Sequence, residues 1–405
     1  MDIEELNKEL LKKIDSLPPG CQQCIKGEKL VLFITGICGE NCYYCPISKK
    51  RKEKDVIYAN ERKINSIEEC IEECLLCGSK GVGITGGNPL LKMEKTYRYI
   101  KALKKRFGPS FHIHLYTTPT VIDENKLKAL KEAGLDEIRL HPTKYFNKYY
   151  HYMKEKNKKH NSSKEIEEYL EGFLGTLKLC MEYIRDVVVE IPSIPKYENE
   201  IIHLLEEIEK IGVRFININQ LEYSETNYRA LKSMGFLEKN TYTSEILGSE
   251  ETAKIIIDYF NKKIENGKSK LTIHYCPSIL KDGIQMKNRL INRAKNVAKE
   301  YEIITDEGLL LRGIVSFKNI GDVKDLLEIL EYNSILYEID ENKCNIYLNP
   351  YVLEDIICYL KDNNYNFKFG GYISERYPTH DELEVERIPL ITKKRSLKSL
   401  RKNMK

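Results

Sequence analysis

Three cysteines stand close together in a segment that has neither helical nor strand periodicity. Cys38, Cys42 and Cys45 follow the apolar run 29–35 with the spacing Cys-x3-Cys-x2-Cys. Three thiolates on one loop can each bind one iron of a cubane and leave the fourth iron without a protein ligand. Zinc is the alternative metal, but it usually requires a fourth ligand. The spacing therefore predicts a [4Fe–4S] cluster with one open iron.

The aromatic residue before the third cysteine completes a family pattern. With Tyr44 directly before Cys45, the loop resembles the motif of the radical S-adenosylmethionine (SAM) superfamily. The resemblance implies that the open iron binds the amino and carboxylate groups of SAM, and that the reduced cluster cleaves SAM to a 5′-deoxyadenosyl radical. It also implies that Tyr44 packs beside the adenine and that a donor such as ferredoxin or flavodoxin supplies the electron.

A second resemblance lies in the turn after the next apolar run, 81–85. Gly86, Gly87, Asn88 and Pro89 look like the glycine-glycine-acid-proline turn of the superfamily, which binds the amino group of SAM. Glycines let a backbone approach a ligand closely. Asn88 stands where the family has an acid, and its amide oxygen can accept a hydrogen bond from an ammonium group only without the help of a charge.

Short β-rich runs alternate with helical segments and must position both loops. The runs are 29–35, 81–85, 112–117, 137–140, 187–191, 215–219 and 271–275. The alternation predicts an α/β fold with a parallel sheet, here a partial (β/α) TIM-like barrel of the radical SAM type over residues 29–280. Loops at the carboxyl ends of such strands carry the active site. Residues 147–163 and the long gap between 219 and 271 are candidate substrate-facing insertions.

Polar residues near the ends of later strands are further candidates for the same rim. Arg139 and His141 end the fourth run, where polar residues of similar enzymes contact the carboxylate or ribose of SAM. Counting strands places five further polar residues near the ends of the fifth and sixth runs: Glu190, Ser193, Asn217, Asn219 and Gln220. Asn219 ranks first among these candidates for the rim of the site.

The chain contains the same cysteine spacing a second time, at Cys70, Cys74 and Cys77. A capping box precedes this copy and Gly78 follows it, which predicts a helix. Seven residues of helix rise about 10 Å, so these thiols cannot easily bind one cubane. We expect them to form a stripe that faces the core.

Two further cysteines, Cys21 and Cys24, follow a pair of prolines within the N-terminal segment 1–28, which also contains a helix. Their spacing predicts a knuckle on a turn. Cys276, or His274 beside it, ends the last run and could complete an auxiliary metal or second iron–sulfur site. Ordinary reduced thiols are the alternative.

The pattern changes after the barrel. A linking helix is expected over 281–305, and residues 306–377 show the order β-α-β-β-α-β of a ferredoxin-like α+β domain, a name that denotes a fold and no cluster. Residues 378–405 form a basic tail without acidic residues after Thr392. The tail could contact RNA or an acidic partner, or simply be a solvated terminus.

Composition limits the class of protein. The chain has 405 residues, 41% hydrophobic and 31% charged, with a net charge of +4, which is too small to indicate nucleic-acid binding by itself. It has no apolar run long enough for a membrane span, and its twelve cysteines at short gaps favour metal binding in the reducing cytoplasm.

The sequence thus resembles most the archaeal uncharacterised proteins related to pyruvate formate-lyase activating enzyme. The resemblance implies an enzyme that abstracts hydrogen from an unidentified substrate, which could be a peptide glycyl site, an RNA base or a cofactor precursor. The alternative is a non-catalytic iron–sulfur or electron-transfer protein.

Overall fold

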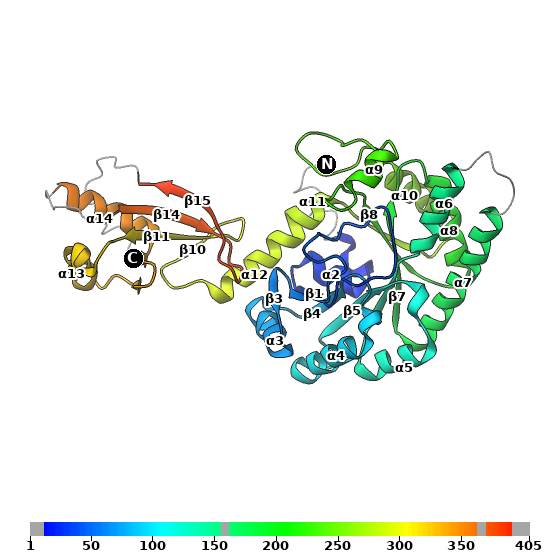
Figure 1. Ribbon diagram of the computed structural model, residues 1–405, viewed down its shortest axis with the longest axis horizontal. Helices are drawn as coiled ribbons and strands as arrows, with labels where there is room; N and C mark the ends of the chain where they lie inside the picture. Colours follow the sequence, from blue (N-terminus) through cyan, green and yellow to red (C-terminus); the bar gives the residue numbers. More distant parts are fainter. Residues whose placement is uncertain (1–11, 155–161, 363–369, 391–405) are drawn as a thin grey trace. The chain divides into compact units, whose positions relative to one another are not determined.

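The computed structural model describes residues 12–154, 162–362 and 370–390, and the chain divides into two units (Figure 1). The first unit comprises Met1–Leu75 and Ser79–Met286, and the second comprises Leu76–Gly78 and Lys287–Lys405. The division near residue 286 lies close to the end of the predicted barrel at residue 280.

A curved, mainly parallel sheet forms the first unit. Its strand order is β3-β2-β1-β4-β5-β6-β7-β8-β9, with β2 and β3 as an antiparallel hairpin beside β1. All seven predicted strands are present, within two residues of their expected bounds. The strands are β1 (Lys29–Phe33), β2 (Ile57–Ala59), β3 (Arg62–Ile64), β4 (Gly81–Thr85), β5 (His112–Thr117), β6 (Glu137–Leu140), β7 (Asp186–Ser193), β8 (Phe215–Gln220) and β9 (Thr272–Cys276). Because β1 pairs with β2 and β4, it is not a neighbour of β9, and the barrel is partial as expected.

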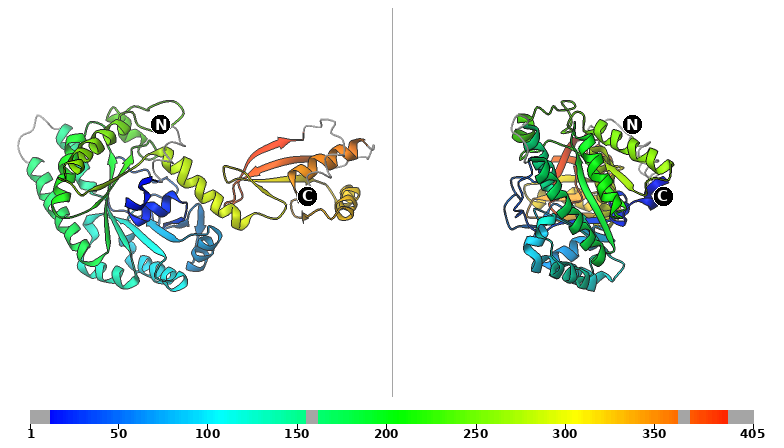
Figure 2. Two further views of the ribbon diagram at one scale, coloured as in Figure 1. Left: turned by 180° about the vertical axis from the view of Figure 1, so that it is seen from behind. Right: turned by 90° about the vertical axis from the view of Figure 1, so that its right-hand side faces the viewer.

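Helices cover the outer face of this sheet, as Figures 1 and 2 show for α4, α5, α7 and α8. Their apolar stripes pack inward, for example through Ile100 and Leu103 of α4. The helices are α3 (Ile67–Leu76), α4 (Met93–Phe107), α5 (Glu124–Ala133), α6 (Thr143–Lys154), α7 (Ser162–Tyr183), α8 (Glu198–Lys210), α9 (Tyr228–Ser233), α10 (Ser249–Glu265) and α11 (Ser278–Leu280), with the short turns η2 (Pro89–Lys92) and η3 (Pro119–Val121).

The two predicted insertions have different outcomes. The gap after β8 contains α9 and α10, so it holds more than one helix as expected. In the segment 147–163, α6 continues to Lys154 and α7 begins at Ser162, and a substrate-facing role of this segment stays a prediction. Tyr145 and Phe146 of α6 are buried, and this packing favours a helix over a loop; residues 155–161 lie outside the described part.

The predicted turn around Cys21 and Cys24 is instead a helix, α2 (Pro19–Ile25), which follows the short turn η1 (Ile14–Ser16). Pro19 occupies the first helical position, which proline favours. The backbone N–H of Gly20 donates to Oε2 of Glu137 on β6 at 2.9 Å, and Cys21 and Ile25 are buried. In Figure 1, α2 lies inside the curve of the sheet. Packing inside the barrel thus makes this segment helical.

The second copy of the cysteine spacing is helical, as predicted. Ser66 and Glu69 form the capping box of α3, with bonds of 3.1 Å in both directions. Cys70 and Cys74 are buried on α3, and Cys77, just after the helix, is buried as well.

The predicted linking helix 281–305 is present but shorter, because the chain is helical without a break from residue 278 to 297 and residues 303–304 form a strand. The π-helical turn η4 (Lys281–Met286) closes the first unit, and α12 (Lys287–Val297) opens the main part of the second.

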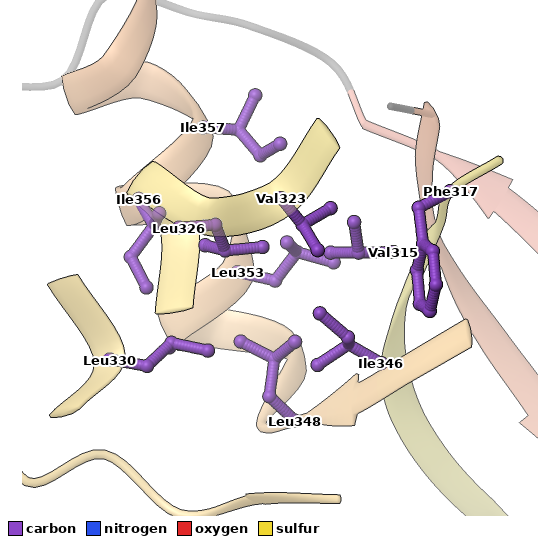
Figure 3. Close-up of a cluster of buried hydrophobic side chains, with 10 residues drawn as sticks. All are labelled: Val315, Phe317, Val323, Leu326, Leu330, Ile346, Leu348, Leu353, Ile356 and Ile357. Carbon is purple, nitrogen blue, oxygen red and sulfur yellow. The ribbon is translucent and has the colours of Figure 1, made fainter. Parts of the chain in front are cut away.

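The second unit is an antiparallel sheet with two helices on one face. The sheet order is β12-β13-β11-β14-β15, with β10 beside β11, and the predicted order β-α-β-β-α-β is present. Figure 3 shows Leu326 and Leu330 of α13 and Leu353 of α14 in the core. The elements are β10 (Ile303–Ile304), β11 (Leu310–Ser316), η5 (Ile320–Val323), α13 (Lys324–Tyr332), β12 (Tyr337–Asp340), β13 (Asn345–Leu348), α14 (Pro350–Asp362), β14 (Gly370–Arg376) and β15 (Glu384–Pro389).

The basic tail is predicted over residues 378–405, but the folded part of the chain extends further than residue 377. Residues 384–389 form β15, which pairs antiparallel with β14, so the sheet extends past residue 377. The basic residues from Lys393 onward lie outside the described residues. Among the described helices, none is long and apolar enough to span a membrane.

Candidate active site

A cavity of about 350 Å³ opens at the carboxyl ends of the parallel strands of the first unit. Its wall includes the three cysteines of the loop after β1, the two glycines after β4, and residues that end β5 to β8. Ten predicted site residues therefore meet on one cavity: Cys38, Cys42, Tyr44, Cys45, Gly86, Gly87, His141, Glu190, Asn219 and Gln220. This is the position that the strand order predicts for the site.

The cysteine loop, residues 38–47, carries thiols that are only partly exposed. All twelve cysteines of the chain lie in the described residues, and none forms a disulfide. Burial raises the pKa of the Cys42 thiol to about 12 and also raises the pKa of Cys38. In the described part of the chain, no three His, Cys, Asp or Glu side chains converge on a single metal ion. A cubane takes one thiolate per iron, so its ligands need not converge on one point.

The glycine turn packs directly against the start of the cysteine loop. Gly86 has a φ of +150°, and a Cβ there would lie 2.3 Å from the carbonyl oxygen of Thr35. A Cβ on Gly87 would lie 2.5 Å from the carbonyl oxygen of Ile37. The backbone N–H of Gly87 donates to the carbonyl oxygen of Thr35 at 2.7 Å. Because a Cβ on Gly86 or Gly87 would overlap the backbone of Thr35 or Ile37, only glycine allows this close approach.

Asn88 and Pro89 lie behind this wall rather than on it. The side chain of Asn88 is fully buried, and its Oδ1 accepts from the backbone N–H of Leu90 at 3.1 Å and from Oγ1 of Thr117 at 2.9 Å. Its Nδ2 donates to Oγ1 of Thr118 at 2.9 Å. The hydrogen bonds of Asn88 therefore stabilise the turn, and its side chain does not reach the cavity wall.

Tyr44 connects the cysteine loop to the next strands through His141. The phenol oxygen lies 2.8 Å from Nε2 of His141, whose Nδ1 lies 2.6 Å from the carbonyl oxygen of Glu190. A carbonyl only accepts, so Nδ1 carries the proton and Nε2 accepts from Tyr44. Burial lowers the pKa of His141, which favours this neutral form. The pair fixes the aromatic ring that precedes Cys45.

Glu190 presents a carboxylate to the floor of the cavity. Its Oε1 accepts from Nδ2 of Asn219 at 2.5 Å, and its Oε2 accepts from Asn217 at 3.0 Å and from Arg139 at 3.4 Å. Arg139 is buried below the cavity, where its Nε bonds Glu137 at 2.6 Å, and it does not line the wall. Arg139 also bonds the hydroxyl of Tyr116 at 3.0 Å, and it acts on the cavity through Glu190 and Tyr116, which both line the wall.

Two residues that the sequence did not single out hold the cysteine loop in place. Nδ2 of Asn227, which is buried, donates to the carbonyl oxygens of Tyr44 at 3.1 Å and Glu222 at 2.9 Å. The hydroxyl of Thr226 lies 3.0 Å from the carbonyl oxygen of Cys45. Both follow β8 in the long gap that was expected to face the substrate, which is the only signal that pointed to them.

Comparison with known proteins identifies the family. A model described as the radical SAM superfamily matches residues 32–208. A Methanocaldococcus jannaschii protein, provisionally named a glycyl-radical enzyme activating enzyme, is 58% identical over 395 residues, which are 97% of this chain and 98% of that protein. The chain belongs to the radical SAM superfamily. This confirms the resemblance of the two loops and indicates an enzyme, against the alternative of a non-catalytic electron-transfer protein.

Other comparisons add less. Residues 308–390 match a domain of unknown function, DUF8061. The crystal structure of Streptococcus suis SuiB bound to the precursor peptide SuiA has a TM-score of 0.42 and 12% identity, and covers 68% of this chain and 53% of that chain. The structure of anSMEcpe with bound AdoMet has a TM-score of 0.38 and 16% identity, with coverages of 60% and 63%.

Radical SAM enzymes bind an iron–sulfur cluster and SAM, and the residues of the cavity fit both groups. The three thiols offer the donors that an iron–sulfur cluster takes. The two glycines beside them leave backbone without side chains on the wall, as a closely held ligand requires.

The auxiliary metal site stays a prediction, since among the described residues no three His, Cys, Asp or Glu side chains are placed to hold one metal ion. Sγ of Cys21 receives hydrogen bonds from Asn217 at 3.2 Å and from Arg139 at 3.3 Å, and burial raises its pKa to about 12. Cys276 packs against an apolar cluster that contains Cys21, and burial raises its pKa to about 12 as well. Cys24 is half-buried on α2. The surroundings of Cys21 are those of a protonated thiol.

Proposed function

We propose that this radical SAM enzyme installs a radical on a glycyl residue of a partner protein. Cys38, Cys42 and Cys45 hold a [4Fe–4S] cluster, and SAM occupies the cavity beside Gly86 and Gly87. When bound and reduced, the cluster would supply the electron that breaks a carbon–sulfur bond of SAM, giving methionine and a 5′-deoxyadenosyl radical. A hydrogen atom then moves from the glycine Cα to the 5′ carbon and leaves the radical on the peptide.

The observation that carries this proposal is the meeting of three partly exposed thiols and two side-chain-free positions on one cavity wall. The provisional name of the 58% identical relative supports a glycyl site as the target over an RNA base or a cofactor precursor. The long match, over 97% of the chain, means that the relative shares both units.

The residues of the chain position the reactants. Tyr44 is fixed by His141 so that its ring can bound the adenine, and Asn219 and Glu190 offer polar atoms to the ribose side of the cavity. An electron donor such as a ferredoxin or flavodoxin is required. The second unit has the order and sheet of a ferredoxin-like domain, and we assign it as one.

The test is anaerobic reconstitution with iron and sulfide, reduction with dithionite, and chromatographic measurement of 5′-deoxyadenosine formed from SAM. The wild-type protein should form it, and a Cys38→Ala variant should not. The control is Cys180→Ala, because Cys180 is buried on α7 away from the cavity wall. If the wild-type protein carries a cluster that is visible by electron paramagnetic resonance but neither perturbed by SAM nor able to cleave it, the proposal is wrong.

A further inference from the structure

The rim of the cavity carries one ion pair that the cofactors do not explain. Nζ of Lys281 lies 3.3 Å from Oε1 of Glu222, and both residues line the cavity. Their side chains remain 32% and 26% exposed, so the pair can still reach a ligand. Lys281 opens the π-helical turn η4, and such turns frequently occur at functional sites.

The pair is held rigidly relative to the cysteine loop. The hydroxyl of Ser278 contacts Oε1 of Glu222, and the backbone N–H of Ser278 donates to Oε1 of Gln220 at 2.9 Å. The carbonyl oxygen of Glu222 accepts from Asn227, which also bonds the carbonyl oxygen of Tyr44. A ligand bound at the pair is therefore fixed relative to the residue that precedes Cys45.

The charges of the wall indicate what the pair can bind. Among the described residues that line the cavity, Glu190, Glu222 and Lys281 carry the charges. Glu190 already accepts hydrogen bonds from Asn217, Asn219 and Arg139, whereas Glu222 and Lys281 are charged groups at the rim. An anion at Lys281 would face the carboxylate of Glu222, and a cation at Glu222 would face the ammonium group. A neutral group with a donor beside an acceptor satisfies both partners, and a residue of an extended peptide, whose own N–H and C=O point to the same side, is such a group.

The size of the cavity points the same way. A volume of about 350 Å³ lies near the lower end of pockets that hold one small molecule. Glycine has no side chain to recognise, so the contacts must come from the main chain around it.

We infer that Glu222 and Lys281 are the substrate-recognition pair and bind the N–H and C=O of one extended residue in the polypeptide segment that carries the target glycine. Lys281 donates to the carbonyl oxygen, and Glu222 accepts from the N–H. This inference rests on the proposed function, because it takes a glycyl peptide as the substrate.

The test uses a pool of heptapeptides with blocked ends, random flanks and a central glycine that carries two deuterium atoms on Cα. The full-length reconstituted enzyme is supplied with SAM and dithionite, and mass spectrometry measures deuterated and total 5′-deoxyadenosine. In Lys281→Met and in Glu222→Gln, the pool concentration for half-maximal deuterium transfer should rise about tenfold, as expected for the loss of one charged hydrogen bond.

Two further variants separate recognition from general damage. Lys263→Met removes a similar pair, with Glu206 at 3.1 Å, between the outer helices α10 and α8, and should behave like the wild type. The double variant Glu222→Lys, Lys281→Glu keeps one donor and one acceptor and should recover part of the lost affinity.

The possible results are distinct. An unchanged half-maximal concentration in both single variants would overturn the inference. Deuterium transfer from free dideuterated glycine but not from the peptide pool would overturn it as well, while SAM cleavage upheld the radical chemistry. If the wild-type enzyme forms no 5′-deoxyadenosine at all, the proposed function fails and the inference fails with it.

Discussion

The two copies of the Cys-x3-Cys-x2-Cys spacing lie in opposite environments. Cys38, Cys42 and Cys45 stand on a loop, partly exposed on a cavity, whereas Cys70 and Cys74 are at most 1% exposed on the helix α3. The same thiols at the same spacing therefore serve different purposes, and the backbone decides which. A loop can direct its side chains to several irons, while a helix aligns them on one stripe toward the core.

The largest expected difference concerns iron. Cys42→Ala should reduce the iron content of the reconstituted protein to background, because the cubane loses a ligand. Cys74→Ala should keep full iron and lower the free energy of unfolding by about 1–2 kcal/mol, as a core truncation does. Iron analysis and chemical denaturation measure the two effects. Loss of iron in Cys74→Ala would show that the second copy also binds a cluster.

A glycine lies next to each copy of the cysteine spacing, Gly87 beside the cysteine loop and Gly78 directly after Cys77. In Gly87→Ala, the new Cβ would press on the carbonyl oxygen of Ile37, and we expect SAM to bind about 10- to 100-fold more weakly, from an overpacking cost of about 1–3 kcal/mol. Gly78 has a φ of +59°, and its nearest neighbour would be the flexible side chain of Asn296. Gly78→Ala should therefore cost about 1–2 kcal/mol of stability and leave SAM binding unchanged. Titration calorimetry with SAM distinguishes these results, and equal losses of affinity would contradict the comparison.

Alkylation of the cluster-free protein compares the thiols themselves. Burial raises the pKa of Cys42 to about 12, so its thiolate fraction, and with it the rate of labelling by iodoacetamide, should rise about tenfold per pH unit from pH 8 to pH 10. In the unfolded protein the rise should level off above about pH 9, near the ordinary thiol pKa. Cys74 should be labelled only when the fold opens. Mass spectrometry of labelled peptides reads each site, and fast labelling of Cys74 in the native protein would show that α3 is not closed.

The sequence predicted the strands and the cysteine loop well, because both depend on local pattern. Short apolar runs and a capping box act over a few residues, so β4 and α3 could be predicted directly. Arg139 shows the limit of prediction from local pattern. Alternation puts Glu137, Arg139 and His141 on one face of β6. Only the structure shows that the guanidinium of Arg139 bonds Glu137, whereas His141 lies at the rim of the cavity. The helical form of α2 likewise depends on partners more than 100 residues away.

The same limit applies to the contact that holds each loop. Asn227 bonds the carbonyl oxygen of Tyr44 across 183 residues of chain, and no spacing rule connects the two. The second copy has a matching contact, because Nδ2 of Asn296 donates to the carbonyl oxygen of Leu76 at 3.1 Å, and Leu76 precedes Cys77 as Tyr44 precedes Cys45. An asparagine thus bonds the equivalent carbonyl in both copies, once beside a cavity and once at the end of a core helix.

These two asparagines give the smallest and most specific prediction. Asn227→Ala leaves the buried carbonyl oxygens of Tyr44 and Glu222 without this donor, and the cysteine loop should then release its iron to a chelator about three- to tenfold faster, as expected for the loss of net hydrogen-bond energy of about 1 kcal/mol. Asn296→Ala removes an exposed contact, and its iron release should match the wild type. Absorbance of the iron–chelator complex over time measures both rates. Equal acceleration in the two variants would mean that iron retention follows overall stability, and that the difference between the loop and the helix lies in the thiols alone.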